Sequence, residues 1–206
     1  MLGSRHAPFA LPPEIERVLA AAYAEPHRAY HTAAHIAEVL RWYDHVADTA
    51  GWHDPAAVYL AVVFHDAVYD PAAIDNEARS AELARQLAGA AGLAPAAIDR
   101  VAELILLTAR HGKLDPAAVA ADPDAAHFLD CDTAILGAPP AEFDAYDAAI
   151  AAEYAHVPAE AFRAGRRAFL AGLLARPRIF LSELFHARLD AAARANLTRA
   201  LARYQP

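Results

Sequence analysis

The sequence has one cysteine, no long uninterrupted apolar run and no excess of basic residues. Cys131 is the single cysteine among 206 residues, which excludes an intramolecular disulfide and fits a reducing compartment. The apolar stretch over residues 56–64 is interrupted at His65, well short of the ~20 residues that cross a bilayer. Residues 1–13 contain no long apolar segment followed by a cleavage site, as a signal peptide would. We therefore expect no membrane association and a cytoplasmic location.

The charge balance is acidic, with a formal net charge of −8. Nonspecific binding to nucleic acid depends on a dense excess of Lys and Arg, so this class of partner is not expected. A small anionic substrate needs only a few local arginines, whose planar guanidinium suits phosphate. The composition therefore favours a small-molecule partner over a nucleic acid.

Helical spacing of apolar residues recurs along the chain, while alternating apolar and polar runs bounded by turn residues are lacking. Linkers rich in Gly or Ser and repeats of fixed period are lacking too. The pattern predicts an all-α fold with residues 1–206 in a single domain. Proline, glycine and capping residues set the expected helices and loops: 12–25, 31–50, a helix from 55 that carries 59–66, 75–87, 95–111, a loop over 112–121, 122–137, 139–156, 159–175, and a final pair after 177.

His65 and Asp66 follow Val62-Val63-Phe64 in a strongly apolar segment that the pattern assigns to a buried helix. Burying an imidazole and a carboxylate is unfavourable unless a partner satisfies them. A divalent metal would do so, since both side chains are metal ligands. A hydrogen-bonded pair in the core is the alternative, and for the dipeptide taken alone it is the more common arrangement.

Two further polar pairs have the spacing of ligands. His31 and His35 are four residues apart and would share one helix face, but Thr32 stands where a HExxH metalloprotease needs glutamate. Asp130 and Asp132 lie in another apolar helix, where one could face a metal while the other caps a helix or pairs with an arginine. Surface exposure is the alternative for both pairs.

The order of His35, His65-Asp66 and Asp132 resembles the signature of the HD superfamily of metal-dependent phosphohydrolases. That signature is a lone His, a His-Asp pair and a distant Asp, all on helices. The similarity extends to a small subfamily of HD hydrolases over further segments: 30–32, 64–70, 75–77, 80–81, 129–132, 153–154, 165–166 and 193–197.

The resemblance implies an HD-type helical bundle with a core over about residues 28–137, on which helices over 139–203 pack. It implies that one divalent ion is held by four ligands: His35, His65, Asp66 and Asp132. Mn, Fe, Co, Ni, Zn and Mg all fit such a site, and a second metal is compatible with it. The implied activity is hydrolysis of a phosphate ester or anhydride of a small molecule, nucleotides included, by metal-activated water.

Roles for other residues follow from the same resemblance. The catalytic positions implied are Asp66, Asp70 and His111, with Asp70 placed to position water or protonate the leaving group. The substrate-binding positions implied are His31, Glu77 and Arg166. A helix-end carboxylate, a histidine at a helix C-terminus and a solvated arginine are the alternatives for Asp70, His111 and Arg166.

Two other functions compete with this interpretation. Glu153-x-x-His156 and Glu183-x-x-His186 match the Glu-x-x-His pattern of ferritin-like dimetal bundles, which would make the chain an oxygen-dependent oxidoreductase. That alternative leaves His65-Asp66 unexplained. A non-enzymatic nucleotide-sensing HD module is the second, and binding of nucleotide without phosphate release would favour it.

Overall fold

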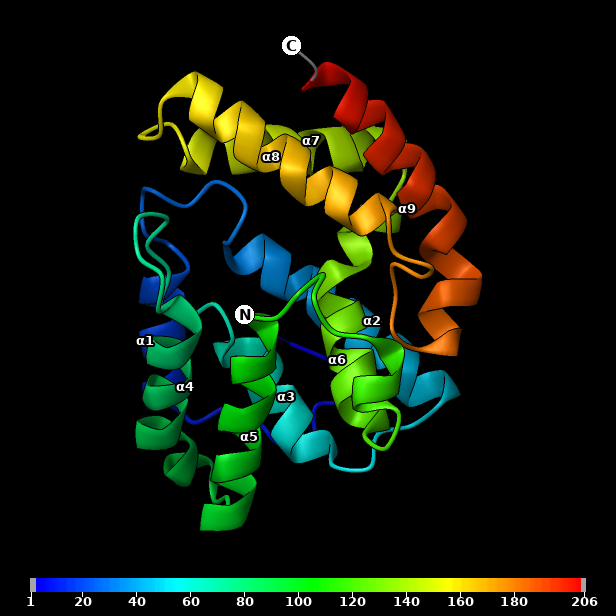
Figure 1. The fold of residues 1–206 in the computed structure, drawn as a ribbon. Helices are drawn as coiled ribbons and strands as arrows, with labels where there is room; N and C mark the ends of the chain where they lie inside the picture. The colour runs from blue at the N-terminus through cyan, green and yellow to red at the C-terminus, as the bar shows by residue number, and fades with distance from the viewer. Residues whose placement is uncertain (1–2, 205–206) are drawn as a thin grey trace.

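The computed structural model describes residues 3–204, and these form an all-helical bundle with no strand among them, as predicted (Figure 1). Three short 3-10 segments, η1 to η3, accompany the α-helices. The bounds of the elements are α1 Pro13–Ala22, α2 Ala33–Thr49, α3 Pro55–Phe64, α4 Asn76–Leu87, η1 Ala88–Ala91, α5 Pro95–Thr108, η2 Pro116–Val119, α6 Pro123–Thr133, η3 Ala134–Gly137, α7 Pro140–Glu153, α8 Ala159–Leu174 and α9 Glu183–Arg203. No helix within residues 3–204 is both long and apolar enough to span a membrane.

Several helices begin where local capping chemistry predicts. Asp54 and Asp122 each accept a hydrogen bond from a backbone N–H in the first turn of α3 and α6, and a proline follows each of them. Thr32 caps α2 by accepting from the N–H of Ala34. His31 therefore precedes α2, so the expectation that it shares a helix face with His35 is wrong, although the two ring centroids lie 5.9 Å apart.

Helix α3 is the centre of the N-terminal bundle. Every residue from Ala57 to Phe64 is buried, and the helix is packed against α2, α4, α5 and α6. A helix that is apolar on all sides requires such neighbours around its whole circumference. His65, which follows the last residue of α3, consequently lies in the interior.

The polar dipeptide lies beyond the helix that was expected to contain it. α3 ends at Phe64, with His65 as its C-cap and Asp66 in the following turn. Continuing the helix would leave the carbonyl of Ala67 without its donor, because Pro71 has no N–H. Arg28 instead donates to the carbonyls of Asp66 and Ala67, and this tertiary contact stabilises the turn.

Helices α7, α8 and α9 cover one end of this bundle (Figure 1). Helix α9 packs on η3 and α8, and the side-chain amide of Asn196 donates to the carbonyls of Leu136 and Ala138. A Cβ at Gly137 would lie 2.7 Å from the Cβ of Leu189, so only glycine permits this approach. One contiguous core joins both parts, from Leu11 to Ala200.

Further element boundaries differ from expectation. The final pair of helices is one helix, α9, preceded by an irregular segment over 176–182. Helix α5 ends at Thr108, so His111 lies in the turn after it. The expected loop over 112–121 contains the short segment η2.

Candidate metal centre and cavity

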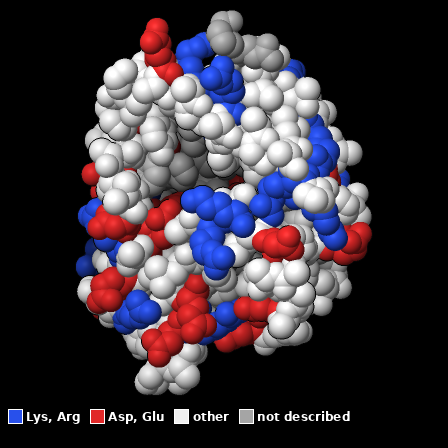
Figure 2. Space-filling view, viewed as in Figure 1, with Lys and Arg blue, Asp and Glu red and all other residues white. Residues whose placement is uncertain are grey.

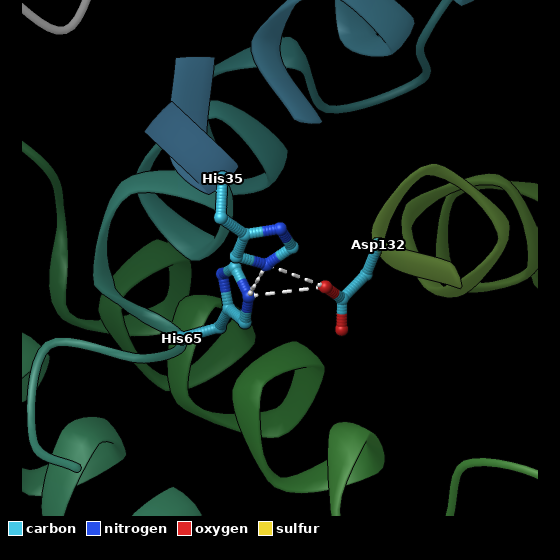
Figure 3. A group of neighbouring side chains, drawn as sticks. All are labelled: His35, His65 and Asp132. Carbon is cyan, nitrogen blue, oxygen red and sulfur yellow. Dashed lines mark hydrogen bonds and ion pairs between the residues drawn. The ribbon is translucent and has the colours of Figure 1, made fainter. Parts of the chain in front are cut away.

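Donor atoms from three elements meet at the centre of the bundle. Nε2 of His35 on α2 lies 3.3 Å from Nε2 of His65, and Oδ1 of Asp132 on α6 lies 3.0 and 3.3 Å from these two nitrogens (Figure 3). Oδ2 of Asp66 lies 3.1 Å from Nε2 of His65 and 3.5 Å from Nε2 of His35. The four predicted ligand residues therefore lie close to one another: the donor atoms of His35, His65 and Asp132 form one group with ligand spacing, and Asp66 lies beside the two histidines.

These separations fit the donor atoms of a metal site. Ligand atoms bonded at about 2.1 Å to one ion are about 3.0 Å apart at a right angle and about 3.4 Å apart at a tetrahedral angle. His65 adds a second criterion, because its Nδ1 lies 2.9 Å from the carbonyl oxygen of Val62. Only an N–H can donate to a carbonyl, so in the neutral ring it is Nε2 that has the lone pair and faces the other donors, as in a metal-bound histidine.

The electrostatics of the cluster favour positive charge at its centre. Burial alone lowers the pKa of His35 and of His65, but the nearby carboxylates of Asp132 and Asp66 outweigh it and raise both pKa values. Burial likewise raises the pKa of Asp66 and Asp132, and the imidazoles outweigh it and hold both values well below the usual range. A divalent cation among these donors would supply the positive charge that the two carboxylates attract.

Asp132 and Asp130 have separate partners. The second oxygen of Asp132 lies 2.6 Å from Nε2 of His111, a contact that orients the carboxylate. Asp130 accepts hydrogen bonds from the N–H groups of Leu181 and Ser182 and from the Ser182 hydroxyl. Burial raises the pKa of Asp130 to about 6 despite these donors. Asp130 therefore anchors the segment before α9 and does not point to the histidines.

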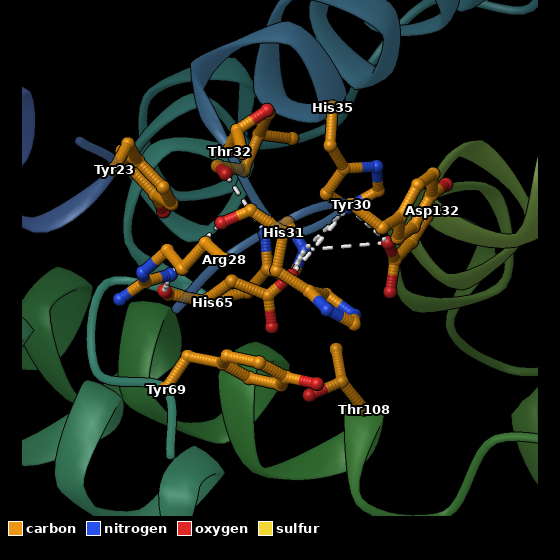
Figure 4. A network of polar contacts seen from close by, with 12 residues as sticks. Tyr23, Arg28, Tyr30, His31, Thr32, His35, His65, Tyr69, Thr108 and Asp132 are labelled. Carbon is orange, nitrogen blue, oxygen red and sulfur yellow. Dashed lines mark hydrogen bonds and ion pairs between the residues drawn. The ribbon is translucent and has the colours of Figure 1, made fainter. Parts of the chain in front are cut away.

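Arg28 organises the backbone around the cluster. Its guanidinium is buried between the rings of Tyr23 and Tyr69, at 5.3 and 5.5 Å from their centroids (Figure 4). It donates to the carbonyl of His31 and, as noted above, to two carbonyls after His65. One side chain thus joins the segment before α2 to the turn after α3.

Glu153 at the end of α7 also binds the backbone of the segment before α2. One oxygen accepts from three consecutive N–H groups, those of residues 29–31, at 2.7 to 3.0 Å. The other accepts from the Tyr69 hydroxyl and lies 2.7 Å from Nδ1 of His31. Burial acts to raise the pKa of Glu153, but the His31 ring and these donors prevail and lower it to about 2. His31 is thereby oriented with Nε2 as the ring nitrogen available to a ligand.

A cavity of about 620 Å³ opens beside the cluster, between the N-terminal bundle and helices α7 and α8. Its polar end is formed by His31, Asp66, His111 and Asp132, whereas His35 and His65 are buried. Figure 2 shows the surface hollowed in its upper half, with mainly uncharged side chains above the hollow and charged ones below it. A ligand in this cavity reaches Asp66 and Asp132 directly.

The remaining predicted site residues are divided between the cavity and the surface. Glu77 and Arg166 line the cavity, and the guanidinium of Arg166 lies 2.9 Å from the carboxylate of Asp147. Asp70 is exposed, does not line this cavity and accepts a hydrogen bond from the N–H of Ala72. The expected position of Asp70 one helical turn beyond Asp66 is wrong, because no helix continues past Phe64.

The two Glu-x-x-His segments do not meet. Glu153 binds residues 29–31 and His156 is exposed, while Glu183 pairs with Arg178 and His186 with Asp190. In the part of the chain that the structure describes, one group of at least three His, Cys, Asp or Glu side chains has the spacing of metal ligands. It consists of His35, His65 and Asp132. The ferritin-like alternative lacks its ligand set there.

Sequence reasoning missed the roles of Arg28, Glu153 and Tyr69. Arg and Glu side chains usually face water and Tyr is intermediate, and no local pattern distinguishes these three residues from exposed ones. Each of the three has a partner more than 35 residues away in the sequence. Comparison with protein-family models, curated proteins and solved structures finds no match for this chain.

Proposed function

We propose that the chain is a metal-dependent phosphohydrolase of the HD superfamily that cleaves a phosphate ester or anhydride bond of a small molecule. The observation that carries the proposal is the convergence of two imidazoles and two carboxylates at the polar end of an open cavity. Two histidines and two carboxylates with open access on one side are the donor set of a catalytic rather than a structural metal site.

His35, His65, Asp66 and Asp132 would hold the ion. When bound there, a divalent metal supplies Lewis acidity and an activated water. His31 and His111 line the same end of the cavity, where the imidazolium form of either ring would offer its second N–H to a phosphate oxygen. Glu153 orients His31 through its Nδ1, and His111 in turn orients Asp132.

The chain offers no activated nucleophile at this end. Cys131 is 1% exposed, and burial together with the adjacent Asp130 and Asp132 raises the pKa of its thiol well above the usual range. The hydroxyls of Thr108 and Thr133, which line the cavity, donate to backbone carbonyls of their own helices. Attack by water without a covalent phosphoenzyme is the mechanism that these residues support.

Metal analysis combined with phosphate release tests the proposal. The purified protein should bind about one divalent ion per chain, and His65→Ala or Asp66→Ala should lower that occupancy sharply. His156→Ala, which removes an exposed histidine, is the matched control and should retain the metal. Full occupancy in both cluster variants would place the metal elsewhere.

The loaded protein is then screened for phosphate release across phosphate esters and anhydrides, with Mn, Fe, Co, Ni, Zn or Mg added back. Release that disappears in His65→Ala supports a phosphohydrolase. Absence of release from every compound, with the ion in place, would contradict it. Nucleotide binding without release would favour a sensor.

A further inference from the structure

The lining of the cavity is polar beside the cluster and mainly apolar elsewhere. Apart from its polar end, its wall is mainly aromatic and aliphatic and comes from the turn before α4 and from α7 and α8. The apolar wall includes Ile74, Tyr146, Ile150, Tyr154, Phe162 and Phe169. A pocket with one polar end and apolar walls fits a ligand whose own polar and apolar parts are separated in the same way.

Exposed hydrophobic side chains mark the same cavity. Within residues 3–204, four large apolar side chains are exposed, and two of them line it: Ile74, 99% exposed, and Phe169, 40% exposed. Ile74 precedes α4 and Phe169 lies on α8, so two separate parts of the chain contribute them to the cavity. Exposed apolar side chains that gather at a cavity indicate a ligand-binding surface.

The scarcity of cationic side chains along the cavity wall limits how many phosphate groups a bound ligand can carry. Arg166 is the arginine that lines the cavity, and its guanidinium is paired with Asp147 and stacked on Tyr146 and Phe169. The chain's one lysine, Lys113, does not line it, whereas acidic Asp66, Glu77 and Asp132 do. A polyphosphate chain carries several negative charges and is normally held by several cationic side chains.

We infer that the cavity binds a phosphate monoester with an aromatic or other bulky apolar body, and that it discriminates against nucleoside triphosphates. This inference rests on the proposed function. The phosphate lies at the polar end beside His31 and His111, and the apolar body lies against Ile74, Phe162 and Phe169. In the reaction, water adds to phosphorus, the bond to the ester oxygen breaks, and that oxygen gains a proton. The products are inorganic phosphate and an alcohol or phenol.

Calorimetric titration with phosphonates tests the binding mode without turnover, because their C–P bond is not hydrolysed. The metal-loaded protein should bind phenylphosphonate about tenfold or more tightly than methylphosphonate, since burial of the ring adds apolar contact area. A non-hydrolysable nucleoside triphosphate analogue should bind more weakly than phenylphosphonate. Ile74→Ser and Phe169→Ala should reduce the preference for the phenyl group.

Leu106→Ala is the matched control, because Leu106 on α5 is also 40% exposed and does not line the cavity. It should leave the phenyl preference unchanged. Equal affinity for the two phosphonates, or tighter binding of the triphosphate analogue, overturns the inference even if phosphate esters are hydrolysed. Selective phenylphosphonate binding that depends on Phe169 supports it, and if no ester were hydrolysed, only the phosphohydrolase proposal would fail.

Discussion

At the scale of single residues, two aspartates on one helix have different partners and different roles. Asp130 and Asp132 are two positions apart on α6, which places them about 200° apart around the helix axis. Asp132 faces the two histidines, and Asp130 faces the N–H groups before α9. The same substitution at the two positions therefore separates metal binding from stability.

Asp132→Asn should weaken metal binding by at least about tenfold, because it removes a charge from the ligand set. Asp130→Asn should leave metal affinity unchanged and lower the free energy of unfolding by about 2 kcal/mol, since an amide NH₂ would replace one of the acceptor oxygens. Metal titration and urea denaturation of both variants measure these effects. Greater metal loss in Asp130→Asn would reverse the assignment of the pair.

At the scale of elements, α7 is joined to the segment before α2 by one carboxylate. Glu153 accepts three consecutive N–H groups and contacts both His31 and Tyr69. Three aligned N–H groups and two side-chain donors favour the charged form, which is why the pKa falls although the site is buried. This contact couples the position of α7, and with it one wall of the cavity, to the orientation of His31.

Glu153→Gln should lower the free energy of unfolding by about 2 kcal/mol at pH 7, because hydrogen bonds to a charged acceptor are lost. The pKa of Glu153 falls from 4.5 to about 2 on folding, so its contribution is fully present above pH 4.5 and is lost as the pH falls toward 2. The stability difference between the natural protein and Glu153→Gln should shrink over that range. Chemical denaturation at pH 7, 4 and 3 measures it.

Glu160→Gln is the control for this series, since Glu160 is exposed at the start of α8. Its effect on unfolding should be small at each pH. A difference for Glu153→Gln that stays constant from pH 7 to pH 3 would contradict the role of the charged carboxylate.

At the scale of the whole molecule, the candidate metal centre connects parts of the chain that are distant in sequence. Its donors come from α2, from the turn after α3 and from α6, so the unfolded chain has no comparable site. An ion that binds only the folded state stabilises that state. The gain in the free energy of unfolding grows with the logarithm of the ratio between the free ion concentration and the dissociation constant.

Removal of the metal with a chelator should lower the Tm by roughly 5–10 °C, the change expected when about 2.7 kcal/mol of binding free energy is lost from a chain of this size. Addition of the ion should restore it. His65→Ala should show no metal-dependent shift, and this variant is the control in the same thermal scan. An unchanged Tm in the natural protein would show that no ion contributes to the folded state.

Features that depend on neighbouring residues in the chain can be predicted from the sequence alone. Helical spacing predicts the all-α fold, and Asp54-Pro55 and Asp122-Pro123 predict the starts of α3 and α6, because caps involve only the next three residues. The resemblance to the HD signature predicts four ligand residues, of which His35, His65 and Asp132 have ligand spacing and Asp66 lies beside the two histidines.

The partners that polar groups find across the bundle cannot be predicted in this way, because they follow from how the helices pack. Arg28 donates to the carbonyls of Asp66 and Ala67 and so stabilises a turn after Phe64 in place of further helix. Asp70 is consequently exposed and outside the cavity. Glu153 is buried because the segment over 29–31 supplies its donors, and Asp130 faces residues 181–182 because α9 packs there. These contacts join residues more than 35 positions apart, and their free energies depend on burial and geometry that exist only after the chain has folded.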